Sequence, residues 1–204
     1  KLQALAETSA EPGAGSSSPA TPGKLQPIPE PAEPGESEIE AASFNGVTPG
    51  VSKSADVEKA WGPAKEISRQ GSVTMHLYAV QPFDRVEVSF VKDTVTSIVI
   101  RLAKAFPAEA VAEQLTLSKV RPVLVSNEMG EILGQAYPER GVMFAFEPST
   151  GSGQVKMSVS QIVLEPITAD PFVLRAETSL NTRCSASRKD LEQALKLAPA
   201  NARA

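Results

Sequence analysis

One order of strand-like runs occurs twice in this sequence, and that recurrence limits the possible folds more than any other feature. The alternating run at residues 86–90 matches the run at 142–146, which lies 56 positions later. Pro82 and Pro138 stand four residues before these two runs, so the offset of 56 holds for the prolines as well. Agreement in order, spacing and proline position together predicts an internal duplication.

The next runs, 95–100 and 159–164, also match, at an offset of 64. The Ser/Gly-rich segment 149–153 explains the longer offset, because insertions belong in hairpin loops. Connections between the alternating runs are short, which favours antiparallel pairing. Helix signals precede the strand-like runs in both halves, so each unit is expected to combine helix and sheet.

The N-terminal part of the chain has a different composition. Residues 1–42 hold seven of the 17 prolines, seven glutamates and two lysines, with few large apolar side chains. Such a stretch does not bury enough surface to offset the entropy of ordering it, so it is predicted to be a disordered linker. The formal net charge of −4 arises in this segment. A nucleic-acid partner is excluded because the folded part supplies no large positive field.

The sequence contains no run of 18 apolar residues, and therefore no predicted membrane span. It begins with Lys1 and has no basic-then-apolar signal stretch, so it is read as a processed product or a fragment. An upstream membrane tether fits this interpretation. An extracytoplasmic location at the cell envelope is accordingly favoured over the cytoplasm.

Residues that could carry chemistry are few. One cysteine and one histidine exclude an internal disulfide and any Cys-only or His-rich metal site. His76 lies in a strand-like run without a recognisable nucleophile, and Cys184 lies in a turn where Arg183 and Arg188 could lower its pKa. No catalytic residue, metal ligand or cofactor is therefore assigned, and the chain is predicted not to be an enzyme.

A resemblance to known proteins starts at residues 50–57 and the sequence Trp61-Gly62-Pro63. These residues resemble the motif that opens the helical layer in the SmpA/OmlA outer-membrane-assembly lipoproteins and in the tandem β-lactamase-inhibitor-protein fold. The resemblance covers about residues 46–167. It implies helices packed on a small antiparallel sheet, no enzymatic activity, and a surface presented to another protein.

The C-terminal segment resembles a tetratricopeptide repeat. Ser187, Leu191, Ala194 and Pro199 match the small, large, small and proline positions of the second helix of that repeat. The matching first helix contains residues 174–176. One such repeat does not bury its own apolar face. The resemblance therefore implies either a longer repeat-containing protein or a helical hairpin that docks on the preceding module.

These features together predict an α+β fold. Its expected parts are a disordered linker over residues 1–43, a duplicated helix-plus-antiparallel-sheet unit over 44–168 with units at about 46–103 and 104–168, and a C-terminal α-helical hairpin over 169–204.

Candidate protein-binding residues lie in two corresponding loops. Tyr137 and Arg140 flank Pro138, and Phe83 and Arg85 follow Pro82. Aromatic residues and arginine are enriched among the anchors of protein interfaces. If the two units share one sheet surface, these loops are expected to lie near each other; the alternative is that both are turns shaped by proline.

The sequence therefore predicts a non-catalytic protein–protein interaction module or scaffold, with a protein or peptide as its partner. One alternative is an envelope-associated assembly or stabilising factor, tethered by an upstream membrane anchor. A second alternative is an enzyme domain whose site surrounds His76 or Cys184.

Overall fold

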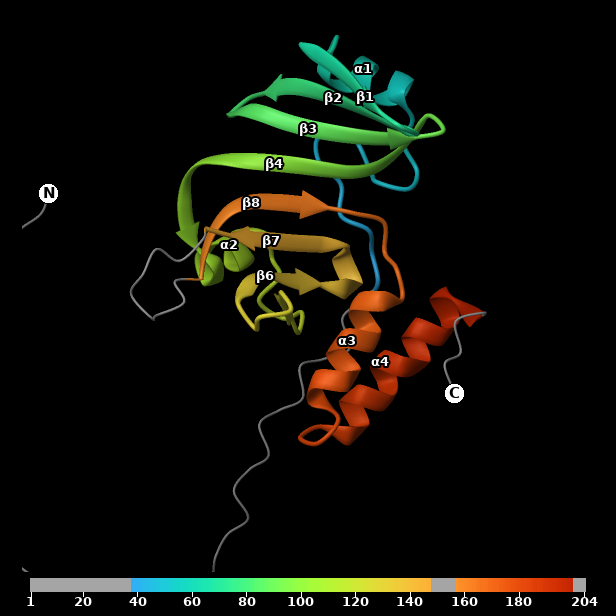
Figure 1. Cartoon of the computed structure of the whole chain (residues 1–204), viewed down its shortest axis with the longest axis vertical. Coiled ribbons are helices and arrows are strands. Elements are labelled where there is room, and N and C mark those ends of the chain that lie inside the picture. Colours follow the sequence, from blue (N-terminus) through green and yellow to red (C-terminus); the bar gives the residue numbers. More distant parts are fainter. Residues whose placement is uncertain (1–37, 148–156, 200–204) are drawn as a thin grey trace, which may run out of the picture. The chain divides into compact units, whose positions relative to one another are not determined.

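The computed structural model describes residues 38–147 and 157–199 (Figure 1). Residues 1–37 of the expected linker, the expected loop at 149–153 and the last residues of the expected hairpin, 200–204, lie outside the described residues. The elements in chain order are α1 (Ser54–Trp61), β1 (Glu66–Gln70), β2 (Val73–Val80), β3 (Phe83–Val91), β4 (Thr94–Pro107), α2 (Ala108–Gln114), β5 (Val123–Ser126), β6 (Ile132–Tyr137), the 3₁₀ turn η1 (Pro138–Arg140), β7 (Val142–Phe146), β8 (Ser158–Leu164), α3 (Asp170–Ser179) and α4 (Cys184–Leu197).

The eight strands form one antiparallel sheet in the order β1-β2-β3-β4-β8-β7-β6-β5. Its two central strands are β4 and β8, which are far apart in the sequence. Their pairing places Ile98 opposite Leu164 and Ile100 opposite Ile162. The edges of the sheet are β1 and β5.

The predicted fold class, a duplicated helix-plus-antiparallel-sheet unit with a C-terminal helical hairpin, is wrong. All eight strands belong to a single sheet, and β4 continues through residues 103 and 104, where the expected units would divide. Central strands β4 and β8 each pair on both sides, so no sheet edge separates the halves. The last two helices are joined to the sheet by a buried ion-pair network, described below, and all described residues belong to one compact unit.

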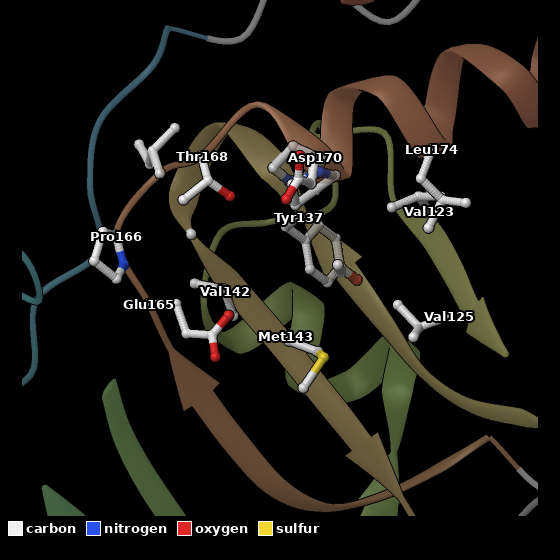
Figure 2. A pocket seen from close by; sticks show the side chains of 15 residues that line it. Val123, Val125, Tyr137, Val142, Met143, Glu165, Pro166, Thr168, Asp170 and Leu174 are labelled. Atoms are coloured by element: carbon white, nitrogen blue, oxygen red, sulfur yellow. The ribbon is translucent and has the colours of Figure 1, made fainter. Parts of the chain in front are cut away.

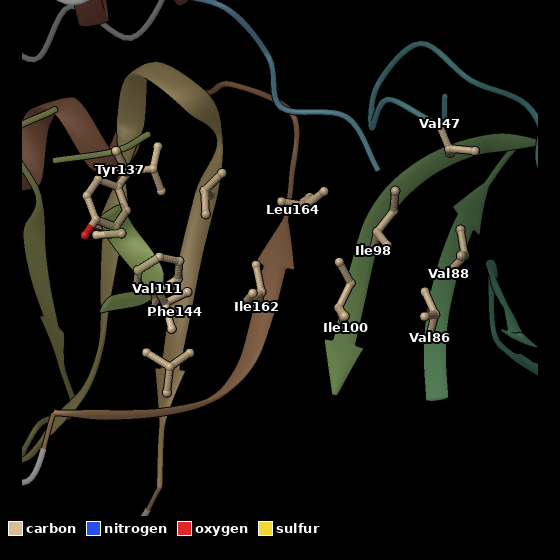
Figure 3. Packing of buried hydrophobic residues seen from close by; sticks show 14 of the residues in the cluster. Val47, Val86, Val88, Ile98, Ile100, Val111, Tyr137, Phe144, Ile162 and Leu164 are labelled. Atoms are coloured by element: carbon tan, nitrogen blue, oxygen red, sulfur yellow. The ribbon is translucent and has the colours of Figure 1, made fainter. Parts of the chain in front are cut away.

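One face of the sheet carries the hydrophobic core (Figure 3). Residues directly opposite one another in an antiparallel pair point to the same face. Val88, Ile98, Leu164 and Val142 form such a row across β3, β4, β8 and β7, and each is at most 5% exposed. Val111 of α2 packs in the same cluster. The core is thus continuous from one half of the sheet to the other.

Helix α1 belongs to the same core. Val57 on its inner face is fully buried. The Trp61 ring packs edge-on against Phe44 and Tyr78, at centroid distances of 5.4 Å in both cases. Gly62, at φ 83°, ends the helix in a conformation that glycine adopts without steric strain.

Candidate binding site

A pocket of 270 Å³ lies between the sheet and the first turns of α3 (Figure 2). Val123 and Val125 of β5 and Met143 of β7 line it from the sheet side. Pro171 and Leu174 of α3 line it from the helix side. A concave, mostly apolar lining of this kind is typical of sites that accept an apolar group.

The strand register explains why these side chains meet. Val123 lies opposite Ala136, and Ala136 lies opposite Met143, so the three side chains share one face of β5, β6 and β7. Val142 and Phe144 point to the other face, into the core. The pocket therefore lies on the sheet face away from the core, where α3 approaches it.

The charged side chains among the described residues that line the pocket are both acidic. Glu165 and Asp170 are exposed carboxylates of the lining, and no lysine or arginine of the described residues lines it. Tyr137 also lines it, but its ring is only 2% exposed and its hydroxyl accepts a hydrogen bond from the Gln135 amide. Burial raises the pKa of Tyr137 and outweighs the lowering effect of that hydrogen bond.

The wall of the pocket depends on a close approach at Gly141. This residue has φ 61°, and its carbonyl oxygen accepts a hydrogen bond of 2.8 Å from the Glu165 amide. A Cβ atom at this position would overlap the carbonyl oxygen of Glu165. Only glycine lets the start of β7 pass so near the segment that leads from β8 to α3.

We expect Gly141→Ala to lower the free energy of unfolding by about 2 to 3 kcal/mol, measured by urea denaturation. Gly71→Ala is the matched control, because Gly71 has the same φ of 61° but nothing lies within 4 Å of an added Cβ. The control should lose only about 1 kcal/mol, which is the conformational part. Equal losses in the two variants would show that the approach to Glu165 imposes no steric limit.

A buried arginine joins α3 and α4 to the sheet. Arg175 of α3 is 4% exposed, and its Nη2 lies 2.5 Å from Oε1 of Glu139 in η1 and 2.7 Å from Oδ1 of Asp190 in α4. Its Nη1 also donates to the carbonyl oxygen of Arg121, whose own side chain pairs with Asp190. Burial disfavours the charged form, but the hydrogen bonds and charges of Glu139 and Asp190 outweigh it and raise the pKa of Arg175.

The candidate residues Tyr137 and Arg140 occupy different environments. Tyr137 is in the core, where its ring packs at 5.1 Å from the Phe144 ring. Arg140 is partly exposed, and its Nη1 lies 2.5 Å from Oε2 of Glu40. Backbone hydrogen bonds from Glu40 and Ala42 to η1 hold the incoming chain at this turn.

Phe83 and Arg85 lie at the other candidate loop. The Phe83 ring packs at 5.8 Å from that of Phe44, and Arg85 is an exposed side chain paired with Glu87 at 2.6 Å. β3 and β7 run in opposite directions, so the loops that precede them lie at opposite ends of the strands (Figure 1). Among the described residues, no hydrogen bond, ion pair or ring contact joins the two pairs directly, but segment 40–44 contacts both: the Ala42 amide donates to the Arg140 carbonyl, and the Phe44 ring packs against Phe83.

His76 and Cys184, the residues of the enzyme alternative, make other contacts. Nδ1 of His76 lies 3.1 Å from the Tyr78 hydroxyl, and its ring centroid lies 4.6 Å from that of Phe90. Cys184 is exposed at the start of α4 and donates to the Leu180 carbonyl. Neither contact pairs a nucleophile with a general base. Among the described residues, no group of three or more His, Cys, Asp or Glu side chains could hold a metal ion.

Burial lowers the pKa of His76 and outweighs the opposite influence of Glu58. The unfolded chain binds the same proton with a pKa near 6.5, so protonation favours unfolding. The contribution of neutral His76 to the free energy of unfolding should be fully present above pH 6.5. It should be lost as the pH falls through the lower pKa of the folded state. We expect a His76 NMR titration midpoint below 6.5, and a smaller stability loss between neutral and acidic pH in His76→Gln. A midpoint above 6.5 would contradict this.

Comparisons with known proteins place the chain in no family. No protein-family model matches it, and no curated protein matches it. Two solved structures are similar in part. One is a cysteine-rich secretory protein from Staphylococcus aureus, with a TM-score of 0.32 and 10% identity over 56% of this chain and 42% of that one. The other is an extracellular protein with an SCP domain from Bacillus anthracis, with a TM-score of 0.34 and 9% identity over 72% and 51%. The chain thus spans about half the length of these structures.

No helix in the described part of the chain is both long and apolar enough to cross a bilayer.

The pocket was not foreseen, because its walls come from segments that are distant in the sequence. The sequence indicated Tyr137 and Arg140 beside Pro138; Tyr137 and Pro138 line the pocket, and Arg140 does not. Nothing in the sequence indicated that Leu174 would lie against β5. The buried group around Arg175 was also missed, since a charged residue in a helix is usually solvated.

Proposed function

We propose that this chain is a non-catalytic protein-interaction module whose pocket between α3 and the sheet accepts an apolar side chain of a protein partner. The supporting observation is the pocket itself, which combines an apolar wall with a rim whose charged groups, among the described residues, are Glu165 and Asp170. Its volume of 270 Å³ is near the lower end of ligand sites and suits one or two side chains.

The wall of the pocket is also firmly held, which favours binding without reorganisation. One side is a strand of the sheet, and the other is a helix fixed by Arg175 to both η1 and α4. A partner side chain would enter a preformed space, so little ordering entropy opposes binding.

Site-directed photo-crosslinking tests this proposal. A photoreactive amino acid at Thr168, an exposed residue of the lining, should yield a protein adduct in an extract of the source organism. The same group at Val51, which is 74% exposed outside the pocket, should not. The substitution Leu174→Trp, which fills the pocket, should abolish the adduct at Thr168. Adducts of equal yield at both positions, or none at Thr168, would reject the proposal.

Two roles proposed from the sequence remain predictions and use the same mechanism. A repeat scaffold and an envelope-assembly factor both act by presenting a surface to another protein. Tetratricopeptide repeats elsewhere in the full gene would favour the scaffold, and an upstream lipobox or membrane helix would favour the envelope factor. Loss of a measured activity in His76→Ala would favour the enzyme alternative instead.

A further inference from the structure

We propose that the partner lays an amphipathic helix over the pocket, with an apolar residue in the cavity and a lysine or arginine three or four positions away at Glu165 and Asp170. This inference rests on the proposed function and specifies the secondary structure and the charge of the partner. It starts from the two carboxylates of the lining, because charges beside an apolar cavity select the charge of the ligand.

The two carboxylates of the pocket are available to a partner. Both side chains are exposed, and neither forms an ion pair with another described residue. By contrast, the nearby Glu139 of η1 is already paired with Arg175 inside the protein. Because no basic residue of the described part of the chain lines the pocket, Glu165 and Asp170 create a negative potential there that a cationic side chain of the partner would neutralise.

Each carboxylate lies one side-chain spacing from the apolar lining. Asp170 and Leu174 both line the pocket and are four residues apart on α3, so their Cβ atoms are about 5–6 Å apart on one face of the helix (Figure 2). The hydrogen bond from the Glu165 amide to the Gly141 carbonyl extends the β7–β8 ladder, so Glu165 is the diagonal neighbour of Met143, at about 7–8 Å. The ligand must therefore hold its cation and its apolar group at a similar separation, about 5–8 Å.

The sheet beneath the pocket favours a helix over an extended segment as the bound element. β6 and β7 are paired on both sides, so their backbone N–H and C=O groups are engaged in the sheet. An extended segment lying across the face of these strands would find no backbone partners there, whereas a helix satisfies its own backbone groups. Residues three or four apart on a helix share one face and have Cβ atoms about 5–6 Å apart, which matches the spacing that the pocket requires.

The experiment selects binders of the full chain from a display library in which one exposed face of a stable helical scaffold is randomised. We expect enriched sequences to carry an apolar residue with a lysine or arginine three or four positions away. Moving that basic residue to two positions from the apolar one keeps the net charge but turns the cation to another side of the helix, so the affinity should fall about tenfold. Enriched sequences without this spacing would overturn the inference.

Charge variants of the chain provide the matched control. Glu165→Gln combined with Asp170→Asn should weaken binding of the selected helix about tenfold at low salt, and less at high salt because salt screens exposed charges. Glu128→Gln combined with Glu147→Gln changes the net charge equally, at exposed residues outside the lining, and should leave the affinity unchanged. Equal losses in the two double variants would overturn the proposed charge recognition.

The remaining outcomes separate this inference from the proposed function. A parallel library of random linear peptides represents the extended alternative. Enrichment in that library alone, with binding lost in Leu174→Trp, would overturn the helix and leave the interaction pocket standing. An adduct at Thr168 without any enriched helix would do the same. A dimer in sedimentation that Leu174→Trp dissociates and the selected helix does not would assign the pocket to a second copy and overturn the inference. Neither adduct nor enriched sequence would reject both.

Discussion

Replacing Arg175 with alanine is expected to lower the free energy of unfolding by about 3 to 5 kcal/mol. The guanidinium is buried between Glu139 and Asp190, and these carboxylates are themselves only 12% and 6% exposed. Without Arg175, Glu139 loses its buried cation, and Asp190 keeps its ion pair with Arg121. The loss therefore reflects carboxylates left in a poorly hydrated site, and urea denaturation followed by circular dichroism measures it.

Arg188→Ala is the control for this variant. Arg188 belongs to the same helical pair and contacts Glu192 at 2.9 Å, but the two side chains are 81% and 53% exposed. A solvated pair of this kind contributes little, so we expect a change of about 0.5 kcal/mol or less. Amide exchange should also accelerate throughout α3 and α4 in Arg175→Ala. A loss no larger than in Arg188→Ala would show that the network does not fasten the helices to the sheet.

Local sequence patterns predicted many individual strands correctly. The alternating run at residues 142–146 is β7, and the run at 86–90 lies within β3, Phe83–Val91. Both have a residue period of two, which reports directly on a strand with one buried face. β1, Glu66–Gln70, was missed because an edge strand exposed on every residue carries no such period.

Local sequence patterns did not indicate which strands pair with each other. The matched runs 95–100 and 159–164 lie in β4 and β8, and these strands pair with each other at the centre of the sheet. Two similar runs can each complete a sheet of their own or join into one sheet, and both arrangements bury the same side chains. Only the contacts between distant segments decide between these arrangements, and they show that the predicted duplicated helix-plus-sheet unit was wrong.

The candidate site shows the same limit. Aromatic and arginine content predicted Tyr137 as a binding anchor, and the structure shows its ring largely buried against Phe144, on the face of β6 that carries the core. Glu139, two residues later, was not singled out and forms an ion pair with Arg175, 36 positions away. Residue type indicates what a side chain can do, whereas burial and partners depend on segments that the local sequence does not identify.

Replacing Phe144 with alanine should lower the free energy of unfolding by about 3 to 5 kcal/mol. The side chain is fully buried in β7, opposite Ile162 of β8 and in the same hydrophobic cluster as Val111 of α2 (Figure 3). Its removal leaves a cavity that strand backbones do not close.

Trp61 is the only tryptophan and packs on β2, in the other half of the sheet. Because β4 and β8 join the halves, Trp61 fluorescence should report the same shift in midpoint as circular dichroism.

Phe106→Ala provides the control, since Phe106 is 39% exposed on β4 and its removal should destabilise by about 1 kcal/mol. The unfolding midpoints from Trp61 fluorescence and from circular dichroism together test whether the two halves of the sheet unfold as one. A continuous core and a central β4–β8 pair require both halves to unfold together. A substitution in β7 should therefore shift the unfolding midpoint that Trp61 fluorescence reports. A Trp61 transition that stays at the wild-type midpoint in Phe144→Ala, while circular dichroism shifts, would mean that the halves unfold separately despite sharing one sheet.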